Sequence, residues 1–423
     1  MLDSLKMFHS FGLCDGEIFY VKENTNIYNY SSGSLKVKNN GTDQGFGIRV
    51  LKDKRIGFSY SNSKTKLGNA IKCALASSKF SIQSEFAFAQ KQNYANIKAY
   101  HSKIANFEEK DFKEIIDKIA HGIKEYSKPI RIILVSGRTE TAIANTNTLF
   151  AHEKRTNIMV YADAKNSDGF GCASYSHYKM LENPYEFGKH AGYMAMKMKN
   201  PKKIKSGKYS VIFSQETLAS LFELLEHSFS GECVRRKISK LWDKKNTELF
   251  SPCLNIYDDP LADGEEKSAF DGEGVRSKKT PLIESGVVKN FYYDRETAAL
   301  AKLKKEGNCI HKDYRSAPSL GGSNTVVSPG NSDSDPENEL KEYVYIESMH
   351  GLHTANTTTG DFGAEVNIAF HIKKNEKKAV RGFIISENIF NLFSKVEYMG
   401  KEQIQTGNFI SPQIAFKDVL LIS

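Results

Sequence analysis

Glu223 and His227 are the two side chains of this 423-residue chain whose spacing could support metal chemistry. They lie four residues apart in Gln215–Ser230, a run that we predict to be a helix, so both project from one face. A catalytic zinc ion needs three protein donors and an open position for water, and a neighbouring glutamate can act as general base. Two donors do not complete that set. A polar pair on the helix surface is therefore the preferred interpretation.

The other residues of this predicted helix need no chemical role. Ser214 is a suitable N-cap, Glu216 suits the first turn, and Gly231 suits the position that follows a helix. Helical spacing of the apolar residues predicts one buried face, made of Leu218, Leu221, Phe222, Leu225 and Phe229.

Further polar candidates occur in two later segments. His350 and His353 flank a glycine, and the residues after them have the composition of a hydrogen-bonded loop rather than of a metal-binding helix. The carboxylates of Asp271, Glu273 and Asp361 could do acid or base work, but Asp, Gly and Glu residues in turns before strands commonly fix local geometry. The candidates for a substrate cleft are His353, Asn356, Asp361 and Asp271.

Composition argues against several other classes of protein. The net charge of +9 comes from 59 basic and 50 acidic residues spread along the chain, so a role in nucleic-acid binding is not expected. The six cysteines are scattered without a CxxC pair, which predicts reduced thiols rather than disulfides or a zinc finger. No apolar run approaches the roughly 20 residues of a membrane-spanning helix. Met1–Leu13, a predicted amphipathic helix, lacks the features of a secretion signal, so we expect a cytoplasmic protein.

Other catalytic motifs do not occur in the sequence. There is no GxSxG elbow and no phosphate-binding GxxxxGK[ST] loop. The glycines Gly45 and Gly47 lie in a strand-like run instead of opening a helix, so they are no dinucleotide fingerprint.

The first half of the chain predicts antiparallel strands packed against helices. The first elements are strands at Ile18–Val21, Ser34–Lys38, Gly47–Leu51 and Arg55–Tyr60, a hairpin turn at Lys52–Lys54, and a helix over Lys66–Ser78. The pattern then partly recurs, with a helix over Glu108–Tyr126, strands at Ile130–Val135, Glu140–Asn145 and Asn157–Ala162, and a helix over Pro184–Lys197. This recurrence is compatible with a diverged duplication.

The second half of the chain is rich in strand signals. Asn200–Lys203 is a predicted boundary, because asparagine, proline and charge end a helix before the strand Tyr209–Phe213. The acidic insert Asn331–Glu342 is predicted to be a mobile surface loop. The predicted class is α+β, with N-terminal antiparallel sheet and helix layers followed by a large β-rich domain. The predicted domains are residues 1–95, 96–203 and 204–423.

Several separated motifs resemble those of the TldD/PmbA family and occur in the same order. They are Gly45–Val50 with Gly57–Ser59, Phe270–Arg276 continuing through Leu282–Lys289 and Tyr293–Arg295, Gly351–Asn356 with Thr359–Phe362, and Phe383–Ile389 with Met399–Gly400. Each motif alone is unspecific, but together they cover nearly the whole chain. The sequence is therefore identified as a member of this family, for which "modulator of DNA gyrase" is an older label reflecting an indirect effect.

The resemblance implies a cytoplasmic assembly that processes unfolded proteins or peptides. TldD-type chains carry His-Glu-x-x-x-His on the helix that matches Gln215–Ser230, and a cysteine near the C-terminus as a further zinc ligand. Phe222 stands where the first histidine would be, and Cys309 is the last cysteine of this chain. The resemblance thus implies the PmbA/TldE branch, with no metal or cofactor in this chain and zinc in a TldD-type partner.

Three functions remain open at this point. The preferred one is a non-catalytic subunit that pairs with a TldD-type partner and holds extended peptides by adding them to a sheet edge. The second is a metallopeptidase or amidase with a non-standard site around Glu223 and His227. The third is a non-enzymatic regulator that binds a protein or nucleic acid. The isolated chain could also pair with itself as a two-fold dimer.

Overall fold

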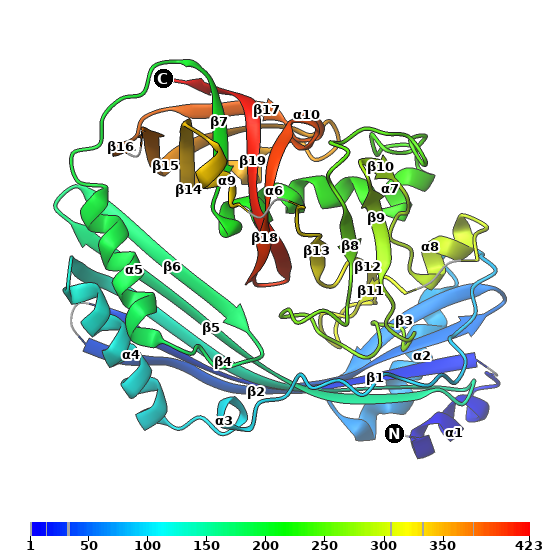
Figure 1. Cartoon of the computed structure of the whole chain (residues 1–423). Coiled ribbons are helices and arrows are strands. Elements are labelled where there is room, and N and C mark those ends of the chain that lie inside the picture. Colours follow the sequence, from blue (N-terminus) through cyan, green and yellow to red (C-terminus); the bar gives the residue numbers. More distant parts are fainter. Residues whose placement is uncertain (1, 14, 32–33, 305–306, 332–333, 375) are drawn as a thin grey trace.

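The computed structural model describes residues 2–13, 15–31, 34–304, 307–331, 334–374 and 376–423. It has two parts, an N-terminal antiparallel sheet covered by helices and a C-terminal part rich in strands (Figure 1). The predicted α+β class is therefore confirmed. Cys14 lies outside the described residues, and the free cysteines are Cys73, Cys172, Cys233, Cys253 and Cys309.

Six strands form the N-terminal sheet in the order β3-β2-β1-β4-β5-β6. The strands are β1 (Asp15–Ser31), β2 (Ser34–Lys52), β3 (Arg55–Ser61), β4 (Lys128–Asn145), β5 (Phe150–Asn166) and β6 (Gly169–His177). The helices are α1 (Leu2–Ser10), η1 (Lys64–Lys66), α2 (Leu67–Ser78), α3 (Ser102–Ala105), α4 (Glu109–Lys124) and α5 (Pro184–Lys197). One sheet thus runs through both predicted N-terminal segments.

The strands are longer than the sequence predicts. The two strands predicted at Ile130–Val135 and Glu140–Asn145 are a single strand, β4, so that prediction is wrong. The polar residues 136–139 stay extended because they pair with β1 on one side and β5 on the other. The prediction also missed β6, which contains glycines of low strand propensity. The predicted hairpin turn is confirmed: Lys52 pairs with Arg55 across two residues of positive φ.

The strand order is symmetric about the β1–β4 pair, and each half consists of three strands and a following helix. In each half, a glycine on the third strand lets that helix approach closely. A Cβ on Gly57 would lie 1.8 Å from the carbonyl oxygen of Ala74 in α2. A Cβ on Gly171 would lie 2.3 Å from the carbonyl oxygen of Ala191 in α5. These equivalent contacts support the predicted duplication.

The C-terminal part contains an eleven-stranded sheet and a separate two-stranded one. Its larger sheet consists of β7 (Gly207–Phe213), β8 (Ile256–Asp258), β9 (Thr280–Glu284), β10 (Val287–Val288), β13 (Thr325–Val327), β14 (Glu342–His350), β15 (Asp361–Lys373), β16 (Glu376–Val380), β17 (Ile384–Asn388), β18 (Val396–Thr406) and β19 (Phe409–Ile422). The smaller sheet pairs β11 (Cys309–Ile310) with β12 (Ser319–Leu320). Because β7 pairs with both β14 and β19, part of the larger sheet closes on itself.

Short helices surround and fill this C-terminal part. They are α6 (Gln215–Glu226), η2 (His227–Phe229), α7 (Gly231–Arg235), α8 (Arg295–Leu300), α9 (Pro336–Glu339), η3 (Leu352–Thr354) and α10 (Ile389–Ser394). The buried face of α6 belongs to the main hydrophobic core, together with residues of β7, β14 and β19. Burial of such apolar side chains is the main stabilising contribution to the domain.

The acidic insert Asn331–Glu342 contains structure that its composition did not predict. It holds α9 and the first residue of β14, and residues 332–333 lie outside the described residues. Pro336 occupies the first turn of α9, where its fixed φ favours a helix, and it is buried. Glu337 accepts a hydrogen bond of 2.9 Å from Gln413 of β19. The described part of the insert is therefore partly helical rather than wholly a loop.

Within the described residues, no helix combines the length and the apolar character needed to cross a membrane.

Candidate functional site

Helix α6 begins and packs as its sequence predicts. The Ser214 hydroxyl accepts a hydrogen bond of 3.2 Å from the backbone N–H of Thr217, which confirms the predicted N-cap. Phe222 is 2% exposed, and its ring centroid lies 5.7 Å from that of Phe409 on β19. The side chain at this position is thus part of the core.

The end of this helix differs from the prediction. Helix α6 stops at Glu226, η2 follows, and Gly231 begins α7 instead of ending the first helix. The N–H of Gly231 donates to the carbonyl of Tyr292 over 2.9 Å, and a Cβ there would lie 2.4 Å from the same oxygen. The glycine is therefore required by a close backbone approach, and the prediction of a helix C-terminus there is wrong.

Glu223 and His227 both lie on the surface. Partial burial raises the pKa of the Glu223 carboxyl. His227 makes its polar contact with Cys233 of α7 rather than with Glu223, over 3.8 Å between Nε2 and Sγ. Sequence reasoning missed this neighbour because the turn at η2 brings α7 back alongside the histidine. In the part of the chain that the structure describes, no three His, Cys, Asp or Glu side chains are grouped to hold a metal ion.

Glu226, next to His227 in sequence, points inward toward a second buried carboxylate. Burial raises the pKa of Glu226 to about 7 and that of Asp258 to about 6. Asp258 accepts hydrogen bonds of 2.7 Å from Ser323 and from Asn308. The chain turns past these groups at Gly322, where a Cβ would lie 2.7 Å from a Glu226 carboxylate oxygen. The apolar pattern of α6 gave no sign of this carboxylate pair.

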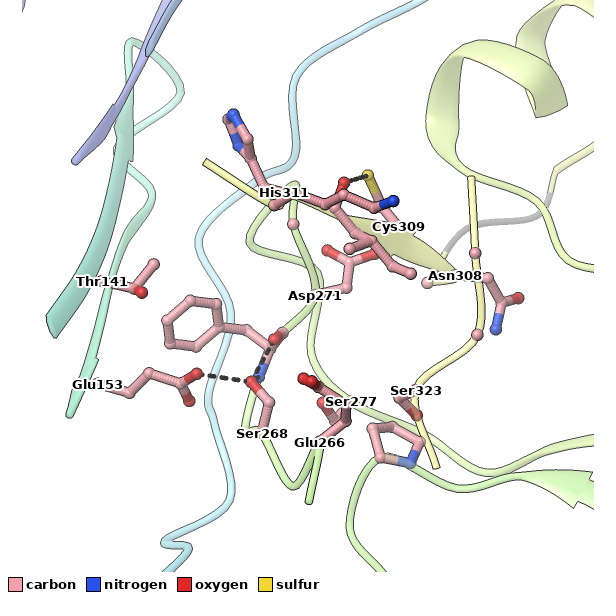
Figure 2. Close-up of a pocket in the computed structure, with 18 of the residues that line it drawn as sticks. Thr141, Glu153, Glu266, Ser268, Asp271, Ser277, Asn308, Cys309, His311 and Ser323 are labelled. Atoms are coloured by element: carbon pink, nitrogen blue, oxygen red, sulfur yellow. Dashed lines mark hydrogen bonds between the residues drawn. The ribbon is translucent and has the colours of Figure 1, made fainter. Parts of the chain in front are cut away.

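A cavity of about 440 Å³ lies between the N-terminal sheet and loops of the C-terminal part. Figure 2 shows Thr141 and Glu153 on its sheet side, and Asn308 and Ser323 on the opposite side. The ionisable residues that line it are Glu153, Arg155, Asp258, Glu266, Asp271, Cys309, His311 and Lys312. Carboxylates outnumber cationic groups among them. This wall chemistry suits a ligand that offers hydrogen-bond donors, such as the N–H groups of an extended peptide.

Asp271 is the one predicted cleft residue that lines this cavity. Its Oδ1 accepts hydrogen bonds of 2.9 Å from the backbone N–H groups of Glu273 and Val275. Its Oδ2 is buried and has no hydrogen-bond partner among the described residues. Burial, and then the charge of Glu273, raise the pKa of Asp271 well above its usual range. This aspartate fixes the turn that forms one wall of the cavity.

A buried ion network beside the cavity joins the two parts of the chain. Arg49 on β2 donates to Glu17 over 2.7 and 2.9 Å and to Glu273 over 2.8 Å. The three side chains are at most 5% exposed. Burial raises the pKa of Glu17 despite the nearby guanidinium. One signal for this network was in the sequence, since Arg49 interrupts an otherwise apolar strand segment.

The glycines of the same β2 motif make room for the C-terminal part. A Cβ on Gly45 would lie 2.3 Å from ring atoms of Tyr314, and a Cβ on Gly47 would lie 3.3 Å from the Tyr314 carbonyl oxygen. The Tyr314 hydroxyl donates to Asp43 over 3.1 Å. The motif Gly45–Val50 is therefore an interface motif, which the sequence did not indicate.

The remaining cleft candidates form a loop elsewhere in the C-terminal part. The Asn356 side chain accepts hydrogen bonds of 3.0 and 3.1 Å from the N–H groups of Thr358 and Thr359. Asn388 donates to Asp361 over 2.7 Å, and this bond is the largest cause of the lowered pKa of Asp361. His353 is exposed on η3. None of these residues is among those that line the cavity, so the structure separates them from Asp271.

The chain thus defines a class of two-part proteins, in which a six-stranded sheet is joined by a buried arginine to a closed, β-rich C-terminal part. The model of the PmbA/TldA metallopeptidase C-terminal domain matches residues 206–423, and that of domain 1 matches residues 16–78. The chain therefore belongs to the PmbA/TldD family.

Known relatives and structures agree with this assignment. An uncharacterised protein, MJ0231, of Methanocaldococcus jannaschii is 28% identical over 96% of both chains. A metalloprotease of Methanothermobacter thermautotrophicus is 24% identical over 88% of this chain and 84% of its own. The crystal structure of TldE from Thermococcus kodakarensis superposes with a TM-score of 0.89 and covers 100% of both chains at 21% identity. This last likeness concerns the fold.

The zinc ion that a metallopeptidase family implies does not fit the residues of α6. Phe222 offers a buried phenyl ring where a donor would be needed. His227 has Cys233 as its polar neighbour, and no third His, Cys, Asp or Glu side chain among the described residues joins them, whereas a catalytic zinc requires three protein donors.

Proposed function

We propose that this chain is the TldE/PmbA-like, non-catalytic subunit of a TldD/TldE-type peptidase that acts on unfolded proteins or peptides. The observation that carries the proposal is Phe222, which is packed against Phe409 in the core where a zinc ligand would have to stand. In this proposal the chain binds substrate and completes the assembly, while a TldD-type partner holds zinc and cleaves the peptide bond. Both subunits work in the cytoplasm.

Two features support a role in holding peptides. The cavity beside Asp271 has walls rich in hydrogen-bond acceptors. Nearby, β6 is the last strand of its sheet, and Gln405 of β18 already donates to its Ser176 carbonyl over 2.8 Å. An edge strand can accept an extended peptide through backbone hydrogen bonds, whatever the peptide sequence. Only unfolded segments could pair in this way, which would select the substrate without a catalytic residue in this chain.

Metal analysis combined with a peptidase assay tests the proposal. The purified chain is analysed for zinc, and cleavage of an unfolded substrate is measured with the chain alone and mixed with a TldD-type protein. We expect no stoichiometric zinc and cleavage only in the mixture. Stoichiometric zinc, with activity of the isolated chain that is lost in Glu223→Ala, would overturn the proposal.

A substitution in the cavity wall tests substrate binding separately. Thr141→Arg places a long cationic side chain at the sheet side of the cavity, away from α6. We expect weaker binding of an unfolded peptide, by about tenfold or more, with unchanged assembly with the partner. Thr247→Arg, at an exposed position outside the cavity, adds the same charge and serves as control. Equal peptide binding by both variants would remove the cavity from the proposal.

The alternative of an independent metallopeptidase or amidase has one supporting observation. Cys233 supplies a thiol 3.8 Å from His227, so the surface beside α6 holds two donors and a glutamate farther along the helix. Zinc bound by the isolated chain and lost in Cys233→Ser would favour this alternative. The number of donors favours the non-catalytic subunit.

A further inference from the structure

Residues 235–245, here called the basic segment, hold much of the positive charge of the chain. Its charged residues are Arg235, Arg236, Lys237, Lys240, Lys244 and Lys245, opposed by Asp243 alone. The net charge of the whole chain is +9, so this short stretch supplies more than half of it. Such a concentration of one sign creates a local field that attracts acidic partners.

Most of this charge faces solvent without an ion-pair partner, although the carboxylate of Asp361 interacts electrostatically with Lys240. Arg235 is paired with Glu232 and Lys244 with Asp243. The side chains of Arg236, Lys237 and Lys240 are exposed and form no ion pair with any described residue. The basic segment is thus not balanced within the fold. Its free charge is available to a second molecule.

An apolar groove of about 460 Å³ borders the basic segment. Its floor includes Leu241, Leu249 and Phe390, and Lys240 and Lys244 also line it. Amides and a hydroxyl complete the lining, from Asn388, Asn391 and Ser394. A groove with an apolar floor, amide groups and a cationic rim matches an apolar side chain on an acidic peptide.

Two exposed apolar side chains extend this surface. Trp242, the only tryptophan of the chain, is 45% exposed, and Ile238 is 46% exposed. Exposed apolar groups of this size beside unpaired charge are typical of interaction surfaces. Figure 1 shows that α10, which forms the far side of the groove, lies at the end of the C-terminal part opposite the N-terminal sheet.

Lysine ammonium groups lie over the aromatic rings of this surface. The ammonium of Lys237 lies 5.0 Å from the Trp242 ring centroid, and that of Lys240 lies 5.3 Å from the Phe390 ring centroid. Binding of single-stranded nucleic acid relies on free aromatic faces on which bases stack. Here ammonium groups occupy the ring faces, so bases cannot stack on them. Ammonium groups bind carboxylates through charge-assisted hydrogen bonds, so we expect carboxylates as the ligands.

We infer that the basic segment and its groove form a docking site for an acidic protein segment that carries an apolar side chain. The carboxylates of that segment bind Lys237, Lys240 and their neighbours, and its apolar side chain enters the groove over Phe390. This site is separate from the cavity beside Asp271. The inference therefore stands or falls independently of the proposed function.

The test uses the full chain and a labelled synthetic peptide of aspartate and glutamate with one central phenylalanine. Anisotropy of the label measures binding, and the fluorescence of Trp242 reports whether the peptide binds at the basic segment. We expect saturable binding with a change in Trp242 emission, weakened as salt is added. Replacing the peptide phenylalanine by glycine is expected to weaken binding several-fold.

Charge reversal provides the matched comparison. Lys237→Glu with Lys240→Glu is expected to weaken binding of the acidic peptide by at least about tenfold. Lys202→Glu with Lys203→Glu makes the same change of charge at exposed positions away from the groove, and is expected to bind as the unmodified chain does. Equal weakening in both double variants would overturn the inference. It would also be overturned by undetectable peptide binding, or by tighter binding of oligothymidylate or acidic lipid vesicles that displaces the peptide.

Discussion

The two halves of the N-terminal sheet share their elements but contact the C-terminal part in different ways. In the first half, Arg49 reaches Glu273 through a buried ion pair, and Gly45 lies against the ring of Tyr314. In the second half, Ser174 donates to Glu216 in an exposed hydrogen bond. The rest of that second contact includes an ion pair between Arg155 of β5 and the half-exposed Glu266, and a small apolar cluster of Met194, Met198, Ile368 and Phe370.

This difference predicts that the first half tolerates fewer substitutions at its contact than the second half does. A buried charge that loses its partner costs several kcal/mol, so the contact around Arg49 tolerates little change in residue type or geometry. Apolar packing and exposed hydrogen bonds accept many alternatives of similar volume. Arg49 lies within residues 16–78, which match the model of domain 1.

The largest effect is expected from Arg49→Met. This change leaves the carboxylates of Glu17 and Glu273 buried without their shared cation, at a cost of about 3–5 kcal/mol in the free energy of unfolding. Urea denaturation of the variant and the unmodified chain measures the loss. The transition is expected to remain detectable, because the large hydrophobic clusters of the C-terminal part and of the sheet under α4 and α5 lie outside this network.

Arg315→Met is the matched control for that variant. Arg315 also links the C-terminal part to β2, through Asp43, but the two side chains are 46% and 49% exposed. An exposed pair contributes at most about 1 kcal/mol, so the control should unfold nearly as the unmodified chain does. Equal losses in the two variants would show that burial does not distinguish these contacts.

The network around Arg49 also marks the limit of what the sequence could predict. Helices with strong apolar periodicity, such as α4 and α2, and the buried position of Phe222 follow from local spacing. Arg49 lies 32 residues from Glu17 and 224 from Glu273, and no local pattern encodes contacts over such distances. For the same reason the sequence indicates the separate motifs that contain Arg49 and Glu273, but not that these two residues form an ion pair. The Glu226 carboxylate was missed because it sits among the apolar residues of α6.

Gly57→Ala and Gly171→Ala test whether the two halves pack their helices equivalently. Each added methyl group would overlap a helix carbonyl, at 1.8 Å in the first half and 2.3 Å in the second. We expect each variant to lose about 1–3 kcal/mol of stability, as overpacked sites do. Gly41→Ala, where a Cβ meets no atom within 4 Å, is the control. If only one of the two variants loses stability, the two halves do not pack their helices equivalently.

A smaller effect is expected from the titration of Glu17. Its pKa is raised in the folded chain above the usual 4.5, because burial outweighs the attraction of Arg49. The folded state therefore holds the proton more tightly than the unfolded state, and this contribution is lost as the pH rises from 4.5 through the raised pKa. Glu17→Gln should flatten the decline in stability over that range, by on the order of 1 kcal/mol.

Denaturation of the Glu17→Gln variant at a series of pH values, beside Glu23→Gln, provides the measurement. Glu23 is exposed on the same strand, so its variant should follow the profile of the unmodified chain. A profile for Glu17→Gln that also matches the unmodified chain would show that Glu17 is not the group that titrates.

The smallest effect is expected from His190→Gln, in the contact of the second half. His190 lies 3.7 Å from Glu347, and the interaction with that carboxylate raises the pKa of the imidazole above 6.5. The stabilisation is therefore complete below pH 6.5 and is lost as the pH rises through the raised pKa. Because the imidazole is 55% exposed, its loss should cost less than about 1 kcal/mol below pH 6.5 and nothing at high pH. The exposed His9→Gln serves as control. If His190→Gln loses as much stability as Arg49→Met, the two halves are attached to the C-terminal part with similar strength.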